Sequence, residues 1–166
     1  MAKLVFRTDA RGSEIDAITR KALWEQGMDY NHGTGHGVGY CLGVHEFPPT
    51  ISKNSDSVLM IGQLLSNEPG FYIPRKFGIR LENLILVKKF SNSINNKLFC
   101  FETVSFCHFE NTLINKDLLD KKEVHWLNDY HETVFHKLKN FLSQDVRKWL
   151  RTVSYTHLTL PTSPKV

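Results

Sequence analysis

A run rich in glycine and histidine, residues 32–45, constrains this chain more than any other feature. It reads HGTGHGVGYCLGVH and holds three of the eight histidines. His32 and His36 have the spacing that zinc-binding helices use, but Gly33 and Gly35 would together cost a helix about 2 kcal/mol relative to alanine. Glycines also let the backbone pass close to a bulky or polar group. We therefore expect residues 28–50 to form a short strand that runs into loops, with at most one helical turn.

Two glutamates follow this run at short intervals. Glu68 stands in the string NEPG and Glu82 in GIRLEN. Imidazoles together with carboxylates suit a divalent metal such as manganese, cobalt or zinc. A glutamate before Pro-Gly is usually solvated, whereas a glutamate inside an apolar strand needs a cation because an unpaired buried carboxylate is costly. For Glu82 that cation is either Arg80, two residues away on the same strand face, or a metal.

The first part of the chain alternates between helical and β patterns. Residues 13–27 predict a helix, with Ser13 as N-cap, Asp16 as the acid of a capping box, Gly27 as terminator and an apolar stripe. The stripe consists of Ile15, Ile18, Ala22 and Leu23. Residues 62–90 predict β structure, and the apolar stretch 79–90 predicts a strand buried on both faces. A polar connection leads to a second strand at 97–109, so we expect an antiparallel hairpin.

The C-terminal part turns helical and then changes character. Residues 116–150 carry an apolar stripe at helical spacing, formed by Val124, Leu127, Val134, Leu138 and Phe141 and broadened by Trp126, Tyr130 and Phe135. Core packing is the ordinary interpretation of such a stripe. Residues 154–166 are rich in Thr, Ser and Pro, lack acidic residues and resemble a non-native tail. Such a tail would contribute nothing to the fold.

Composition narrows the class of protein. The chain has 166 residues, of which 41% are hydrophobic and 23% charged, enough for one domain with a real core. Its net charge of +4 is spread out, so we expect no nucleic-acid partner. Three cysteines at unrelated spacing indicate reduced thiols. No apolar run suits a membrane span or a signal peptide, so we expect no membrane partner and a cytoplasmic location.

Taken together and in order, three motifs resemble those of aminopeptidase P, the X-prolyl aminopeptidases of the pita-bread metallopeptidase superfamily. They are residues 32–46, then NEPGFY at 67–72, then FGIRLEN at 77–83. Flanking strings at 11–16, 101–103 and 126–131 are similar too, and the resemblance covers about residues 4–152. It implies an α+β fold: the second half of a pita-bread domain, with a curved antiparallel sheet and a C-terminal helical extension.

The resemblance also implies a dinuclear metal centre, most often with Mn(II). Carried over residue by residue, His36 and Glu68 would bind one metal, and Glu82 would bridge both. Arg80 would not bind the metal itself but would hold the metal ligands in place, as hydrogen-bonded partners of ligands do at other metal sites. Glu68 would also help to take a proton from the attacking water.

Two histidines would face the substrate. His45 would contact it and assist proton transfer at the scissile bond, and His32 would line its pocket. The implied reaction is hydrolysis of peptides with proline in the second position, which releases the N-terminal residue. A homodimer is implied for the full-length parent enzyme.

The chain departs from the family pattern in two respects. The family has two further metal ligands, both aspartates, and none of Asp9, Asp16 and Asp29 sits in that aspartate motif. Phe47 follows His45 and Glu46 where the family usually has glycine, and it would crowd the pocket or reshape the loop. We therefore expect a C-terminal fragment of such an enzyme, with weak or no peptidase activity alone.

The expected division of the chain is as follows. Residues 1–92 form the C-terminal half of the catalytic domain, residues 93–153 a strand and the helical extension, and residues 154–166 the tail. Two other functions stay open: a non-catalytic pita-bread binding module, or another peptidase of the superfamily such as prolidase.

Overall fold

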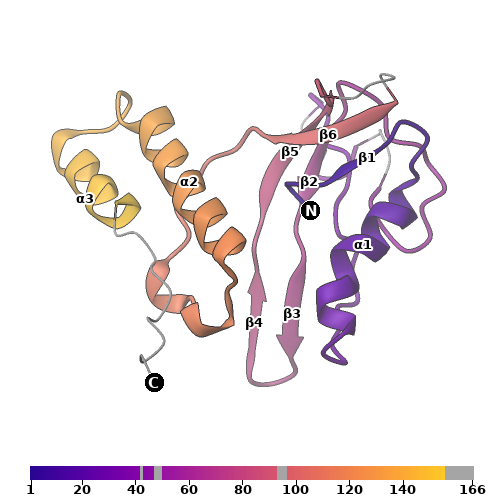
Figure 1. Ribbon diagram of the computed structural model, residues 1–166, viewed down its shortest axis with the longest axis horizontal. Helices are drawn as coiled ribbons and strands as arrows, with labels where there is room; N and C mark the ends of the chain where they lie inside the picture. Colours follow the sequence, from indigo (N-terminus) through magenta and orange to yellow (C-terminus); the bar gives the residue numbers. More distant parts are fainter. Residues whose placement is uncertain (42, 47–49, 93–96, 156–166) are drawn as a thin grey trace. The chain divides into compact units, whose positions relative to one another are not determined.

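The computed structural model describes residues 1–41, 43–46, 50–92 and 97–155 (Figure 1). The chain divides into two compact units, Met1–Ser105 and Phe106–Val166. Phe47 and residues 156–166 of the expected tail lie outside the described residues. No helix among the described residues is long and apolar enough to cross a membrane.

A four-stranded antiparallel sheet forms the body of the first unit. Its order is β1 (Val5–Arg7), β6 (Leu98–Thr103), β5 (Asn83–Lys89) and β2 (Leu64–Asn67). The predicted hairpin is confirmed, with Val87 of β5 opposite Phe101 of β6. The strand at 98–103, which the sequence division groups with the C-terminal extension, thus lies inside the sheet of the first unit.

A two-stranded ribbon continues two of these strands. It pairs β3 (Gly70–Ile73) with β4 (Phe77–Arg80), and its arms run together away from the sheet (Figure 1). The prediction of one strand buried over 79–90 is therefore wrong. All four residues of β4 are exposed, whereas β5 alternates between buried and half-buried positions from Asn83 to Val87. A ribbon of two strands has no neighbouring strand to widen it and buries little.

Helix α1 (Gly12–Trp24) confirms the first predicted helix but begins differently. Its N-cap is Arg11, whose backbone N–H donates to Glu14 Oε2 at 2.8 Å, so neither Ser13 nor Asp16 has its predicted capping role. Gly27 ends the helix as predicted. It has a φ of 67°, and the Met28 N–H donates to the Leu23 carbonyl, the bond that typically closes a helix in this way.

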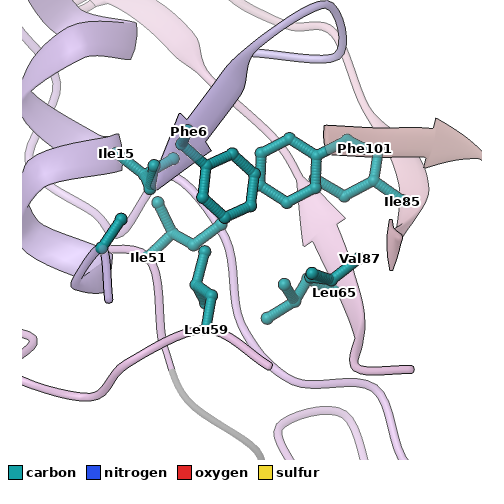
Figure 2. Packing of buried hydrophobic residues seen from close by; sticks show 9 residues of the cluster. Phe6, Ile15, Ile51, Leu59, Leu65, Ile85, Val87 and Phe101 are labelled. Atoms are coloured by element: carbon teal, nitrogen blue, oxygen red, sulfur yellow. The ribbon is translucent and has the colours of Figure 1, made fainter. Parts of the chain in front are cut away.

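The core of the first unit gathers side chains from distant parts of the sequence. Figure 2 shows Ile15 of α1 and Ile51 and Leu59 of the connecting loops packed near Phe6 and residues of the central strands. Of the predicted helix stripe only Ile15 is fully buried, and Ile18 is 52% exposed. Asp16 and Arg20 complete the buried face of α1 instead.

The second unit is helical. It contains α2 (Lys121–Leu138) and α3 (Gln144–Ser154), preceded by the short 3₁₀ turns η1 (Asn111–Leu113) and η2 (Lys116–Leu118). The predicted stripe holds within α2, where Val124, Leu127 and Val134 are buried. Phe141 is wrongly included, because α2 ends before it and its side chain is 86% exposed.

Candidate metal centre

The glycine- and histidine-rich segment is a loop fixed by backbone contacts to the sheet. Its residues form no helix in the described part of 28–46, as the glycines predict. Gly35 bridges to Ile51 and Gly37 to Leu65 of β2. A Cβ on Gly35 would lie 2.1 Å from the Ser66 carbonyl oxygen. The close approach that this glycine permits is therefore to the backbone of β2.

This anchoring places His36 beside Glu68, which follows β2. His36 Nε2 lies 3.3 Å from Glu68 Oε1. The other ring nitrogen, Nδ1, lies 2.9 Å from the Gly37 carbonyl oxygen and must donate to it, because a carbonyl only accepts. Nε2 then faces the carboxylate as a lone pair unless it is protonated. A nitrogen lone pair and a carboxylate oxygen that converge in this way are suited to a shared cation.

Ser66 fixes both groups from within β2. Its hydroxyl accepts from the His36 backbone N–H at 2.9 Å and donates to Glu68 Oε1 at 3.1 Å. Ser66 is fully buried, and the Glu68 side chain is only 12% exposed. A buried hydroxyl bonded to both partners limits how far they can separate.

The ribbon supplies the next two groups. Arg80 Nη1 lies 3.2 Å from Glu68 Oε2, so this glutamate has a cation on its second oxygen. Arg80 Nε donates to the Tyr72 hydroxyl at 3.0 Å, and that hydrogen bond, with the nearby carboxylates, raises the pKa of Arg80 above its ordinary value. The Tyr72 hydroxyl is also 2.9 Å from His32 Nε2. His36, Glu68, Arg80, Tyr72 and His32 therefore form one continuous polar chain.

His45 lies at the open side of this group. Its ring centroid is 4.3 Å from that of His36, in an edge-to-face arrangement, and the residue is exposed. The structure therefore brings together five of the six residues that the sequence singled out: His32, His36, His45, Glu68 and Arg80.

Glu82 differs from its prediction. It is exposed, in the short break between β4 and β5. Arg80, one of the two partners expected for it, forms its ion pair with Glu68, and Glu82 adds a smaller charge interaction. The inference that the two residues share a strand face fails because no continuous strand joins them. Among the described residues no three His, Cys, Asp or Glu side chains are grouped closely enough to hold a metal. His36 and Glu68 fit one side of a metal site.

The three N-terminal aspartates have other partners. Asp9 pairs with Arg7 at the surface. Asp16 and Asp29 both pair with Arg20, at 2.8 and 2.6 Å.

Sequence reasoning missed the roles of Ser66 and Tyr72. Tyr72 lies opposite Gly78, diagonal to Arg80 across the ribbon, and a Cβ at Gly78 would come 2.5 Å from the tyrosine ring. The pairing register of β3 and β4 would have indicated the contact between Tyr72 and Arg80, since long side chains of diagonal neighbours on one face can reach each other. Ser66 lies two residues before Glu68, and no pattern marks it.

Comparison with known proteins identifies the family. Residues 1–89 match metallopeptidase family M24, and residues 97–154 match the C-terminal region of peptidase M24. The chain belongs to metallopeptidase family M24. Its α+β architecture of antiparallel strands and helices is part of the pita-bread fold, and the resemblance to aminopeptidase P is confirmed.

Among curated M24 relatives, the chain is similar to X-Pro aminopeptidases. It is 41% identical over 155 residues to a probable Xaa-Pro aminopeptidase P of Coprinopsis cinerea, covering 89% of this chain and 25% of that protein. It is 39% identical over 142 residues to Xaa-Pro aminopeptidase 1 of Dictyostelium discoideum, covering 83% and 23%. The chain thus spans about a quarter of the length of these relatives.

A solved structure agrees with the sequence comparison. The X-prolyl aminopeptidase of Caenorhabditis elegans, a cytosolic enzyme with a di-nuclear active site, matches with a TM-score of 0.84 and 35% identity. The match covers 93% of this chain and 26% of that one.

Proposed function

We propose that this chain supplies one side of the active site of a metal-dependent X-Pro aminopeptidase. The observation that carries the proposal is the His36–Glu68 pair, whose Nε2 and Oε1 atoms lie 3.3 Å apart while Arg80 pairs with the other carboxylate oxygen. The similarity to X-Pro aminopeptidases over most of the chain supports the reaction class.

In this proposal His36 and Glu68 would hold one divalent metal ion, and Glu82 would be a ligand shared with a second ion. A divalent ion, when bound, polarises an amide carbonyl and lowers the pKa of water. Arg80 holds one oxygen of Glu68 and so leaves the other directed at His36. Glu68 also accepts the proton of the attacking water. Ser66 keeps the carboxylate oriented, as hydrogen-bonded partners of metal ligands do.

The remaining histidines act on the substrate. His45, exposed at the edge of the site, contacts the peptide and assists proton transfer at the scissile bond. His32 lines the pocket, held through its Nε2 by the Tyr72 hydroxyl. The substrate class is peptides with proline in the second position, and the product is the free N-terminal residue.

Several further properties belong to the same proposal. The metal is Mn(II), the parent enzyme is a cytoplasmic homodimer, and neither nucleic acid nor a membrane is a partner. The boundaries 1–92, 93–153 and 154–166 are the corresponding division of the chain. The chain by itself holds at most one side of the centre and has weak or no activity.

A chimera tests this function. Residues 1–154 would replace the matched quarter of the C. elegans enzyme, and release of the N-terminal residue from an X-Pro tripeptide would be measured with Mn²⁺. We expect cleavage that chelation abolishes and that His36→Ala reduces at least a hundredfold.

The matched control is His125→Ala in the same chimera, because that histidine is 79% exposed and pairs with Asp129 of the same helix, α2. This control should leave the rate unchanged. A folded chimera without activity, or activity that persists in His36→Ala, would refute the proposal.

A further inference from the structure

A buried arginine on α1 binds the backbone of the loop that carries the histidines. Arg20 is 3% exposed, although it sits in the middle of a helix of the first unit. Its Nη1 donates to the Tyr30 carbonyl at 2.7 Å, and its Nη2 donates to the His32 carbonyl at 2.6 Å. The guanidinium also lies over the Tyr30 ring, 3.7 Å from its centroid. One side chain thus fixes the loop at its start and at the first site histidine.

Two aspartates orient this guanidinium. Asp16, one turn earlier on α1 and 1% exposed, accepts from Arg20 Nε at 2.8 Å. Asp29, whose side chain is 52% exposed, accepts from Nη1 at 2.6 Å. With two carboxylates and two carbonyls around it, each nitrogen of the guanidinium has an acceptor.

The same cluster extends along the loop to Glu68. The second oxygen of Asp16 accepts from the Thr34 hydroxyl, which is also bonded to the Tyr30 hydroxyl. Thr34 is fully buried, and its backbone carbonyl accepts from the Glu68 N–H at 2.9 Å. Arg20 therefore contacts the backbone of His32 directly, and Asp16 is connected through Thr34 to the backbone of Glu68, a proposed metal ligand.

Stability alone is a weak reason for this arrangement. Removing a charged pair from water is expensive, and well-packed apolar residues in its place are often as stable. Ile15 on the same helix already anchors α1 to the core. The guanidinium instead fixes the positions of its partners. Its planar, rigid set of N–H donors binds several acceptors in fixed directions at once, which an ammonium group cannot do.

We propose that Arg20, oriented by Asp16, is a positioning residue that holds the His32–His36 loop and, through Thr34, Glu68 in the arrangement the site needs. This role rests on the proposed function, because it assumes that the loop and Glu68 belong to an active site. Its test uses neither metal nor substrate, so a failure of the positioning role can be distinguished from a failure of the proposed function.

The test compares Arg20→Lys with Ile15→Val in the full chain. Arg20→Lys keeps the positive charge but removes the planar set of guanidinium donors. Ile15→Val removes one methylene from the core beneath the same helix. Amide hydrogen exchange and the ¹⁵N resonances of the His32 imidazole would be followed at one pH without metal. Hydrogen exchange measured residue by residue distinguishes local opening of the loop from global unfolding.

In Arg20→Lys, the Thr34 and Gly35 amides, bonded to the Ile51 carbonyl, and the Glu68 amide should lose at least tenfold more protection than Val87 in β5. The His32 imidazole resonances should shift. Ile15→Val should lower all these protections by one common factor and leave the imidazole resonances in place. A uniform loss in Arg20→Lys, or unmoved His32 resonances, would overturn the proposal.

Asp29→Asn provides a second variant in case Arg20→Lys does not fold. It removes one charged acceptor of Arg20 at a half-exposed position, so folding should persist. We expect the same selective loss at Thr34 and Glu68, about threefold. Protection identical to that of the unmodified chain at these amides would contradict the positioning role.

Discussion

At the scale of single residues, Glu68 joins the groups of the candidate site. One carboxylate oxygen accepts from Ser66 and faces His36, and the other pairs with Arg80. A nearly buried carboxylate with a partner on each oxygen has one orientation, and that orientation is toward the imidazole. Ser66 and Arg80 therefore fix the orientation of Glu68 that brings its carboxylate 3.3 Å from His36.

The glycines of the loop allow a sharp test at the same scale. In Gly35→Ala the added Cβ would meet the Ser66 carbonyl at 2.1 Å, so loop and strand must separate. We expect a loss of about 2–3 kcal/mol in the free energy of unfolding, typical of overpacking. Gly33→Ala is the matched control, since its nearest atom would lie at 3.4 Å, and it should cost less than about 0.5 kcal/mol. Urea unfolding measures both, and equal losses would contradict the close-approach argument.

The residues also show where sequence reasoning ends. The cluster of His32, His36, His45 and Glu68 follows from ordered motifs, and the structure brings these residues together. The burial of Asp16 and Arg20 does not follow, because a hydrophobicity pattern assigns charged residues to the exposed side of a helix. Their mutual pairing, together with their hydrogen bonds to the loop, makes that face of α1 compatible with the interior.

At the scale of elements, the ribbon explains the error over Glu82. The apolar stretch 79–90 looks like one buried strand, but β4 and β5 are separate strands with Leu81 and Glu82 between them. Alternation assigns side chains to faces only within a continuous strand. The existence and pairing of β5 and β6 were predictable from pattern and turn, whereas the break depends on where the sheet stops and the ribbon continues.

Helix α2 carries a buried histidine, His131, whose surroundings predict an effect of pH. His131 is 1% exposed, its Nε2 accepts from the Phe109 N–H at 3.2 Å, and its ring stacks on His108 at 4.4 Å. Burial, with a smaller contribution from His108, lowers the pKa of His131 from 6.5 to about 4. Below pH 6.5 the unfolded chain therefore binds a proton that the folded chain refuses until about pH 4.

Stability of the second unit should accordingly fall as the pH drops from 6.5 toward 4. Linkage puts the loss from this one group on the order of 2–3 kcal/mol at pH 4.5 relative to pH 7. His131→Gln, which can still accept from Phe109, should remove that part of the pH dependence. Urea unfolding followed by tryptophan fluorescence at the two pH values measures it, and equal pH dependence in both proteins would argue against a buried neutral histidine.

At the scale of the whole chain, apolar surface is exposed on the ribbon. Phe77 and Ile79 of β4, and Leu81 directly after it, are each half exposed or more. The chain spans about a quarter of the X-Pro aminopeptidases it matches. The proposed centre is accordingly one-sided here, with His36 and Glu68 as its ligands.

The count of bound metal tests this central claim most directly. Native mass spectrometry of the chain with Mn²⁺ should show one ion per chain, lost in Glu68→Gln and retained in Glu102→Gln, which changes an exposed glutamate paired with Lys88. No bound manganese at millimolar concentration, two ions per chain, or one ion that Glu68→Gln still binds would contradict the assignment of His36 and Glu68 as one side of the metal centre.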